Sequence, residues 1–229
     1  MARFAGFNRS LLAFLRELAD NNEREWFAEN KHRYDALVLN PALDFIAAMG
    51  PRLEKFAPEF EAIPKRMGGS LMRVYRDTRF GRDKTPYKTN VGIQFRHTQG
   101  KDVHAPGYYV HLAPGEVFIA AGMWHPEPDA LARVRDAIVE KPAEWKKARD
   151  AAAFRRAFTL DGDALKRPPR GVPAEHPFVE DLKRKDFIAT VDLDESAALS
   201  PRFIDDVVNR FRAATPFMKF LCRAVNVPY

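Results

Sequence analysis

The chain has 229 residues, of which 46% are hydrophobic and 30% are charged, so it is long enough to bury a substantial core. Its single cysteine, Cys222, excludes an internal disulfide and any paired-cysteine redox or zinc motif. The formal net charge of +6 is spread along the chain and gives only a weak preference for acidic partners.

The first residues predict neither a leader nor a membrane span. Charged side chains at Arg9, Arg16 and Glu17 interrupt the apolar run that follows the first residues. We therefore expect a cytoplasmic protein that has no membrane partner.

The chain begins with helical patterns. Apolar residues at helical spacing follow Asn8, a residue typical of N-caps, and predict a helix that ends near Asp20. Asn22 and Glu25 have the spacing of a capping box and predict a second helix through Tyr34. Residues 40–41, Asn-Pro, predict a kink or a restart, and the helical pattern then continues to residue 56.

The middle of the chain predicts an antiparallel sheet. Alternating apolar and polar residues give four strands, with a fifth as a further candidate: residues 71–75, 91–96, 107–112, 117–123 and 187–193. Helices are predicted at 129–140, 142–150 and 200–225, and a proline-rich loop at 166–177. The fold class is thus α+β, with four to five strands packed against N-terminal and C-terminal helices. We expect one domain, residues 1–229, because the segment after the proline-rich loop is too short for a strong core of its own.

Strand alternation assigns side chains to the two faces of this sheet. If Leu112 lies opposite Val117, the core face of the second hairpin carries Tyr108, Val110, Ile119 and Met123. In the first pair of strands, Met72 and Val74 with Val91, Ile93 and Phe95 suit the core. The second face then carries Arg73, Tyr75, Gly92, Gln94 and Arg96 with Tyr109, His111, Phe118, Ala120, Gly122 and Trp124. This face suits a planar or anionic ligand, or it is simply covered by the N-terminal helices.

A basic connector joins the first two predicted strands. Residues 76–88 contain five cationic side chains and two carboxylates, and hence a net charge of +3. Such a segment faces an anion, or its charges pair with one another. In the second case, Asp77 and Asp83 would pair with Arg79, Arg82 or Lys84.

The same segment carries a resemblance to a known family. Residues 22–34, 73–80, 83–90 and 106–109 resemble an uncharacterised bacterial and fungal family of similar length, a domain of unknown function. The motif Arg-Asp-x-Arg-Phe-x-x-Asp-Lys-x-Pro-Tyr-Lys, beginning at Arg76, is specific. The resemblance implies a single α+β domain in which the family pattern lies at Arg73, Arg76, Asp77, Arg79, Phe80, Asp83, Lys84, Pro86, Tyr87 and Lys88. It implies no reaction.

Three functions remain open from the residues. The first is binding of a phosphate- or carboxylate-bearing small molecule, and its expected ligand-binding residues are Arg73, Arg76, Arg79, Lys84, Tyr87, Lys88, Tyr109 and Trp124. The second is an enzyme acting on a phosphorylated or nucleotide substrate, with Asp77, Asp83 or His111 as acid or base. The third is nucleic-acid binding, against which the scattered carboxylates argue.

No cofactor is expected, and neither is a metal. His97, His104 and His111 recur every seven residues, with Asp102 nearby, but this spacing gives them no shared face.

Overall fold

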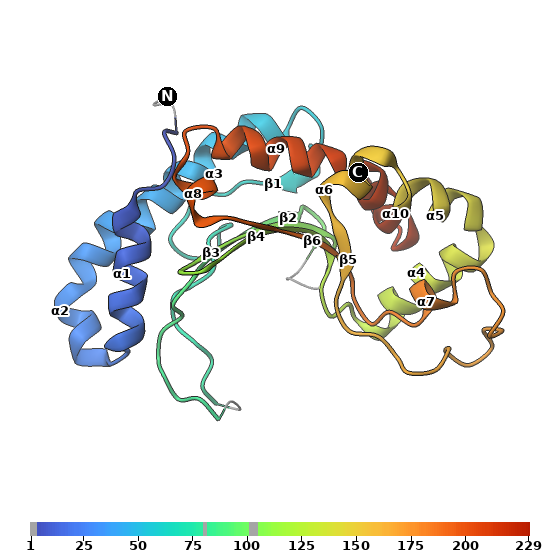
Figure 1. Ribbon diagram of the computed structural model, residues 1–229, viewed down its shortest axis with the longest axis horizontal. Helices are drawn as coiled ribbons and strands as arrows, with labels where there is room; N and C mark the ends of the chain where they lie inside the picture. Colours follow the sequence, from blue (N-terminus) through green and yellow to red (C-terminus); the bar gives the residue numbers. More distant parts are fainter. Residues whose placement is uncertain (1–3, 80–81, 101–104) are drawn as a thin grey trace.

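A computed structural model describes residues 4–79, 82–100 and 105–229. Within them, a six-stranded antiparallel sheet has the strand order β1-β2-β3-β4-β6-β5, and helices flank it (Figure 1). The α+β class is confirmed, with one strand more than the four to five that the sequence predicts. Among the helices of this described part, none combines the length and the apolar character needed to cross a membrane.

The strands lie largely where alternation predicts them. Their bounds are β1 Phe60–Glu61, β2 Val91–His97, β3 Gly107–Ala113, β4 Glu116–Met123, β5 Thr159–Asp161 and β6 Phe187–Leu193. The predicted strand at 71–75 is wrong. Leu71 and Tyr75 form only isolated bridges, to Ile93 and Tyr87, because the chain leaves the sheet there.

Two helices begin the fold, α1 Arg9–Asp20 and α2 Arg24–Tyr34. Asn8 caps α1 as predicted, since its side chain accepts a hydrogen bond from the Ser10 N–H at 3.0 Å. The predicted capping box of α2 is wrong, because Glu23 occupies the N-cap position without a side-chain bond.

The second helix continues into a long rod. A π-helical turn, η1 Asp35–Leu39, joins α2 to α3 Asn40–Leu53 without a break. Pro41 lies in the first turn of α3, where a missing N–H is tolerated.

The second half of the chain adds shorter helices. They are α4 Pro128–Glu140, α5 Pro142–Arg149, α6 Ala152–Ala157, α7 Val179–Leu182, α8 Glu195–Leu199, α9 Phe203–Ala213 and α10 Thr215–Ala224. The predicted helix from residue 200 to 225 is in fact two helices that meet at Ala214. Pro216 lies in the first turn of α10, and proline cannot continue the hydrogen bonding of a preceding helix. Residues 166–177 contain neither helix nor strand, as predicted.

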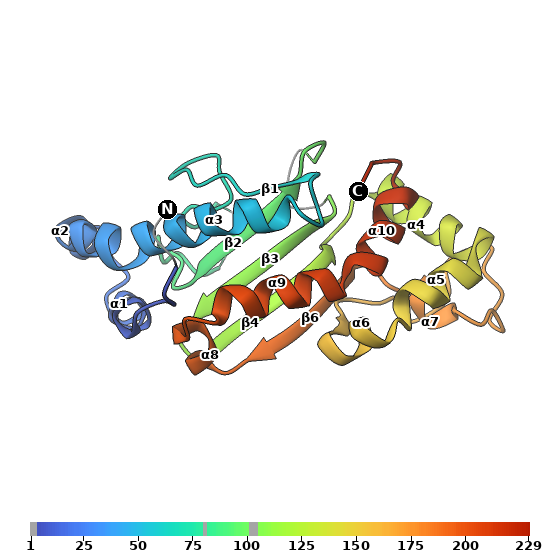
Figure 2. The same ribbon diagram turned by 90° about the horizontal axis from the view of Figure 1, so that it is seen from above.

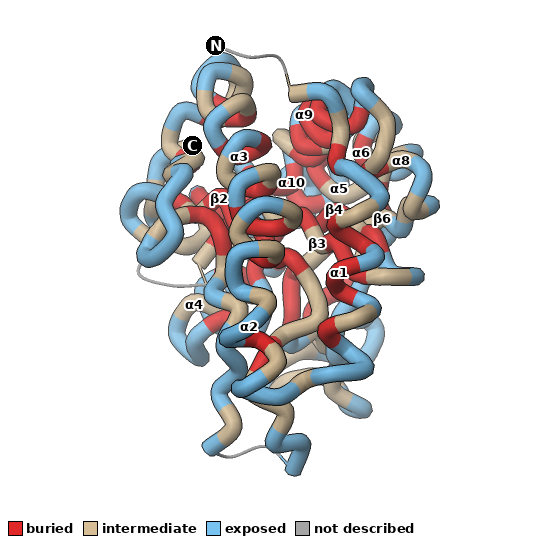
Figure 3. Tube along the Cα trace, turned by 90° about the vertical axis from the view of Figure 1, so that its left-hand side faces the viewer, coloured by how far each residue is buried: buried red, intermediate tan, exposed pale blue. Residues whose placement is uncertain are grey.

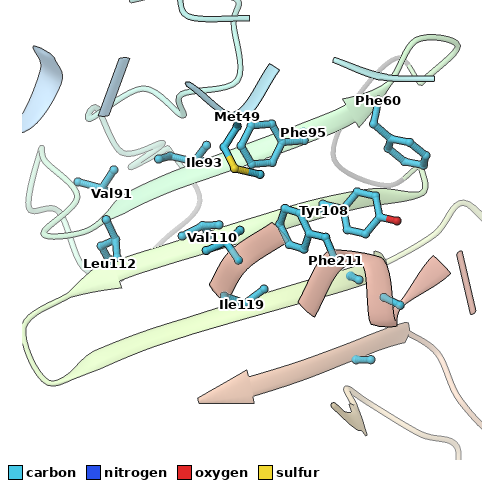
Figure 4. Close-up of a cluster of buried hydrophobic side chains, with 14 of the residues drawn as sticks. Met49, Phe60, Val91, Ile93, Phe95, Tyr108, Val110, Leu112, Ile119 and Phe211 are labelled. Atoms are coloured by element: carbon cyan, nitrogen blue, oxygen red, sulfur yellow. The ribbon is translucent and has the colours of Figure 1, made fainter. Parts of the chain in front are cut away.

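Helices α3 and α9 cover one face of the sheet (Figures 1 and 2). Met49 and Phe211 from these helices pack against Phe95, Tyr108 and Val110 of β2 and β3 (Figure 4). The register pairs Leu112 with Val117, so the predicted core face of the second hairpin is confirmed. Each fully buried large side chain of this kind contributes about 1.5–3 kcal/mol.

The other face of the sheet is not covered by α3 and α9. A long connection, the arm, extends from this side of the molecule; it comprises residues 72–79 and 82–88 (Figure 1). Its far end is largely exposed, whereas buried residues gather in the sheet and the adjoining helices (Figure 3). The arm and the uncovered sheet face together position the candidate site.

Candidate functional site

A pocket of about 500 Å³ lies on the uncovered face of the sheet, with the arm at one end and β5 at the other. Its lining is mostly apolar, with a few polar side chains: Met72, Lys88, Gln94, Gly107, Tyr109, Phe118, Ala120, Ala121, Gly122, Trp124, Asp161, Ile188 and Thr190. An apolar cavity of this size with a few polar groups is the usual form of a small-molecule site.

The floor of the pocket comes from neighbouring strands. Tyr109 of β3 lies between its partners Gln94 of β2 and Ala120 of β4. Gln94 is buried, and its amide makes no side-chain hydrogen bond to the described part of the chain. This amide can therefore donate to a bound molecule or accept from it.

At the arm end, Lys88 is a partly buried cation without a counter-ion. Within the described residues, its ammonium has neither an ion pair nor a hydrogen bond. Burial lowers the pKa of Lys88, and the positive charge of Arg73 lowers it further. Arg73 is exposed, follows the lining residue Met72 in the chain, and likewise makes no hydrogen bond or ion pair in the described ranges. Two cations at one end of an apolar pocket attract an anion.

Tyr109 and His111 form a polar pair on one face of β3. The Tyr109 hydroxyl lies 3.1 Å from His111 Nδ1. His111 stacks on Phe118 with ring centroids 4.6 Å apart, and its buried Nε2 lies 3.7 Å from the Glu116 carboxylate, beyond hydrogen-bond distance. Burial raises the pKa of Tyr109 to about 12 and lowers that of His111. The phenol is therefore protonated at neutral pH.

The far end of the pocket combines an aromatic wall with a carboxylate. Trp124, whose surface is 51% exposed, follows β4 directly. Asp161 of β5 accepts hydrogen bonds from the Gly162 N–H at 2.7 Å and from the Thr190 hydroxyl at 3.3 Å. A ligand that spans the pocket thus has a cationic end and an acidic end to contact.

A buried carboxylate holds the chain just after Trp124. Asp186 is 1% exposed and accepts hydrogen bonds from the backbone N–H groups of His125 and Asp163, at 2.6 and 2.9 Å. The His125 ring Nδ1 lies 3.2 Å from the same carboxylate, and His125 has a positive φ of 45°. Asp186 therefore positions the far wall of the pocket.

The charges at the far end of the arm pair with one another. Arg79 donates two side-chain hydrogen bonds to Asp77, at 3.0 and 2.7 Å, and Asp83 accepts from Arg76 and from both donors of Thr85. These bonds lower the pKa of Asp77 far below its ordinary value, and hydrogen bonds from Thr85, with Arg76, lower the pKa of Asp83 to about 2.

Lys84 joins this group by donating to the Thr78 carbonyl at 2.7 Å. The structure shows pairing of the arm's own charges, with Arg76 and Arg79 as the partners of the two aspartates. The Asp77 and Asp83 carboxylates are exposed and lie outside the pocket.

Tyr87 ties the base of the arm to α2. Its buried ring stacks on Phe27 with centroids 4.0 Å apart. The Asn22 side chain accepts from the Tyr87 N–H and donates to the Tyr87 carbonyl, both at 3.0 Å. Asn22 thus clamps the arm in place of capping the helix.

The structure brings some of the sequence-predicted residues together and separates others. Lys88, Tyr109 and Trp124 line the pocket, with Arg73 and His111 beside them. The remaining ones lie on the arm outside the pocket: Arg76, Asp77, Arg79, Asp83, Lys84 and Tyr87. Phe80, Asp102 and His104 lie outside the described residues.

Comparison with known families gives a match over most of the chain. The model of a family described as "Conserved hypothetical protein (DUF2461)" matches residues 10–220. The chain belongs to this family. The part matched to the DUF2461 family contains the arm and every residue that lines the pocket. Comparisons with curated proteins and with solved structures found no match.

Several pocket residues do not follow from the sequence. Met72 was predicted on the core face, but it lines the pocket because its neighbour Leu71 pairs with Ile93 and takes the core position. Alternation places Gln94 on the correct face but does not identify it as a site residue. No local sequence pattern identifies Asp161 and Thr190 as site residues, because only the pairing of β5 with β6 brings them to the pocket.

Proposed function

We propose that the pocket binds a small organic molecule that has an apolar or planar body and a carboxylate or phosphate group. The observation that carries this proposal is the partly buried Lys88 ammonium, which lines an apolar pocket without a counter-ion in the described part of the chain. A buried cation without a partner is costly, and a bound anion would remove that cost.

The walls support an aromatic or otherwise planar body. Tyr109, Phe118 and Trp124 supply ring surface, and Met72 and Ile188 supply apolar surface that adapts to shape. Gln94 adds an amide on the floor that can fix the orientation of the ligand. We therefore propose the base of the arm as the anion site instead of its far end, where Arg76 and Arg79 have partners.

The test is a thermal-shift and calorimetric screen with aromatic carboxylates and organic phosphates. A Lys88→Met variant removes the charge and keeps an apolar side chain of similar length. We expect about 10- to 100-fold weaker binding, since a charge-assisted contact contributes about 1.5–3 kcal/mol.

Lys84→Met is the matched control, because it removes a lysine from the far end of the arm. We expect it to bind as tightly as the native chain. If no compound stabilises the native protein, or if Lys84→Met and an Arg76→Ala, Arg79→Ala double variant lose binding while Lys88→Met keeps it, the pocket is not the site.

A further inference from the structure

Two reactive side chains line the pocket, a lysine from the base of the arm and a tyrosine from β3. Lys88 and Tyr109 both line the pocket, and the Tyr109 hydroxyl lies over Gly92 beside the Met72 sulfur. Gly92 lies four residues after Lys88, and Met72 is joined to it through a backbone hydrogen bond of 2.9 Å. A lysine amine and a phenol thus line the same cavity.

We propose that the Lys88 amine forms an imine with the carbonyl carbon of the bound anion. The ligand is then an aldehyde or ketone that also carries a carboxylate or phosphate. This inference rests on the proposed function, because it assigns a substrate class to the same pocket.

Lys88 is suited to this chemistry in a way that an exposed lysine is not. An amine attacks a carbonyl only as the neutral base, and an apolar pocket or a neighbouring cation favours that form. Both conditions hold for Lys88, which lines the apolar pocket and interacts with the positive charge of Arg73. Each of them lowers the pKa of Lys88. Arg73 keeps its own charge and remains available to the anionic group of the ligand.

The reaction balances without an oxidant or a reductant. The amine nitrogen adds to the carbonyl carbon, and its proton moves to the carbonyl oxygen to give a carbinolamine. The Tyr109 phenol then protonates the leaving hydroxyl, the C–O bond breaks, and water departs as the nitrogen forms the C=N bond. The phenolate takes the remaining proton from nitrogen. One imine and one water result.

The surroundings of Tyr109 fit the role of proton donor. Its hydroxyl lies 3.1 Å from His111 Nδ1, and the other ring nitrogen of His111 lies 3.7 Å from Glu116, whose side chain is 65% exposed. A proton can thus be exchanged between the phenol and the imidazole, which lies close to a solvated carboxylate.

The experiment is reductive trapping of the intact protein with 4-carboxybenzaldehyde and cyanoborohydride, followed by peptide mass spectrometry. We expect Lys88 to be modified at least about 10-fold faster than Lys84 or Lys147. Lys88→Met should abolish the fast phase, and Tyr109→Phe should slow trapping without a matching loss of affinity for the non-carbonyl analogue 4-(hydroxymethyl)benzoate.

Lys88→Arg is the matched control, because it keeps the cation but cannot form an imine. It should bind 4-(hydroxymethyl)benzoate and give no adduct at position 88. If the native protein binds this analogue through Lys88 but all lysines react with the aldehyde at similar rates, the imine inference is overturned and the proposed function stands. If the analogue does not bind and Lys88 shows no fast labelling, the imine inference is overturned, and the proposed function is overturned as well when no carboxylate or phosphate of the screen stabilises the protein.

Discussion

The absence of a side chain at Gly92 leaves room for the Tyr109 hydroxyl. A Cβ atom at this position would lie 2.7 Å from that hydroxyl and 3.0 Å from the Met72 sulfur, closer than such atoms normally approach. We expect Gly92→Ala to lower the free energy of unfolding by about 1–3 kcal/mol, because it overpacks the junction of the arm and the sheet. Urea denaturation measures the change.

Gly50→Ala provides the comparison. Gly50 lies in helix α3, and the nearest atom that its added Cβ would meet outside this helix is the Ala62 Cβ at 3.7 Å, an ordinary contact. Alanine favours the helix, but Pro51 follows this position and disfavours helical backbone at a residue with a Cβ atom, so this variant should lose clearly less stability than Gly92→Ala. Equal stability of the two variants would contradict the close fit at Gly92.

At the residue scale, the sequence predicts the pocket only in part. Alternation along β2 and β3 places Gln94 and Tyr109 on the uncovered face, and the residues after β4 add Trp124. Alternation does not settle Met72, because a shift of one residue in pairing exchanges the two faces of a strand. It gives no indication of Asp186, whose burial depends on contacts with distant turns.

The arm is an element without regular secondary structure, and its base is held by few contacts. Asn22 supplies both side-chain hydrogen bonds to Tyr87, and Phe27 supplies the ring on which Tyr87 stacks. We expect Asn22→Ala to cost about 1–3 kcal/mol in local stability, because two backbone groups lose their partners. Hydrogen exchange should accelerate in residues 74–79 and 82–88.

Asn21→Ala distinguishes this effect from a general one. Asn21 donates its side-chain amide to the Glu17 carbonyl at the end of α1, and within the described part of the chain it makes no hydrogen bond to Tyr87. Exchange in the arm should be unchanged in this variant. Equal acceleration in both variants would show that Asn22 acts through the helix and does not clamp the arm.

At the element scale, long periodic segments are predicted well and short ones are not. The helix after Asn8 and the strand pairs of the central sheet carry enough repeats to identify them. Strands β1 and β5 have two and three residues, so they have no period to detect. The spacing of Asn22 and Glu25 predicts a helix cap from local sequence alone. In the structure the Asn22 amide bonds to the Tyr87 backbone instead, so the cap does not form.

The whole molecule combines the sheet with the helices of its second half around one cluster of buried side chains. Trp145 of α5 illustrates the link, because its ring contacts both Phe187 of β6 and Phe217 of α10. Its indole N–H donates to Asp181 at 2.8 Å, and Arg149 contacts the same carboxylate at 2.7 Å.

We expect these contacts to make the chain unfold as a single cooperative unit. In differential scanning calorimetry, the calorimetric and van't Hoff enthalpies should agree within error. Asp181→Ala should lower the stability of that one transition by about 3 kcal/mol or more, because it leaves the Arg149 charge without this partner in a partly buried setting. Two resolved transitions, or loss of only one of them in Asp181→Ala, would show that residues 128–182 fold independently.

At this scale, the sequence predicts the class and the two faces of the sheet but not which face is left uncovered. Both faces carry large aromatic side chains, so composition alone favours burial of each. The outcome depends on where the rigid connections place α3 and α9, and no short pattern encodes that. The charge of the connector is similarly ambiguous, since its arginines can pair with its own aspartates or with a ligand.

The rod formed by residues 24–53 has a consequence for how the cavity varies. It contains Phe27, the stacking partner of Tyr87 at the base of the arm, near its start and the core residue Met49 near its end, so the base of the arm and the core face of the sheet share one scaffold. A π turn accommodates one extra residue per turn, and its loss would rotate the first segment relative to the second. Substitutions or deletions in this turn would therefore shift the base of the arm and change the width of the pocket. The residues that line the pocket would stay the same.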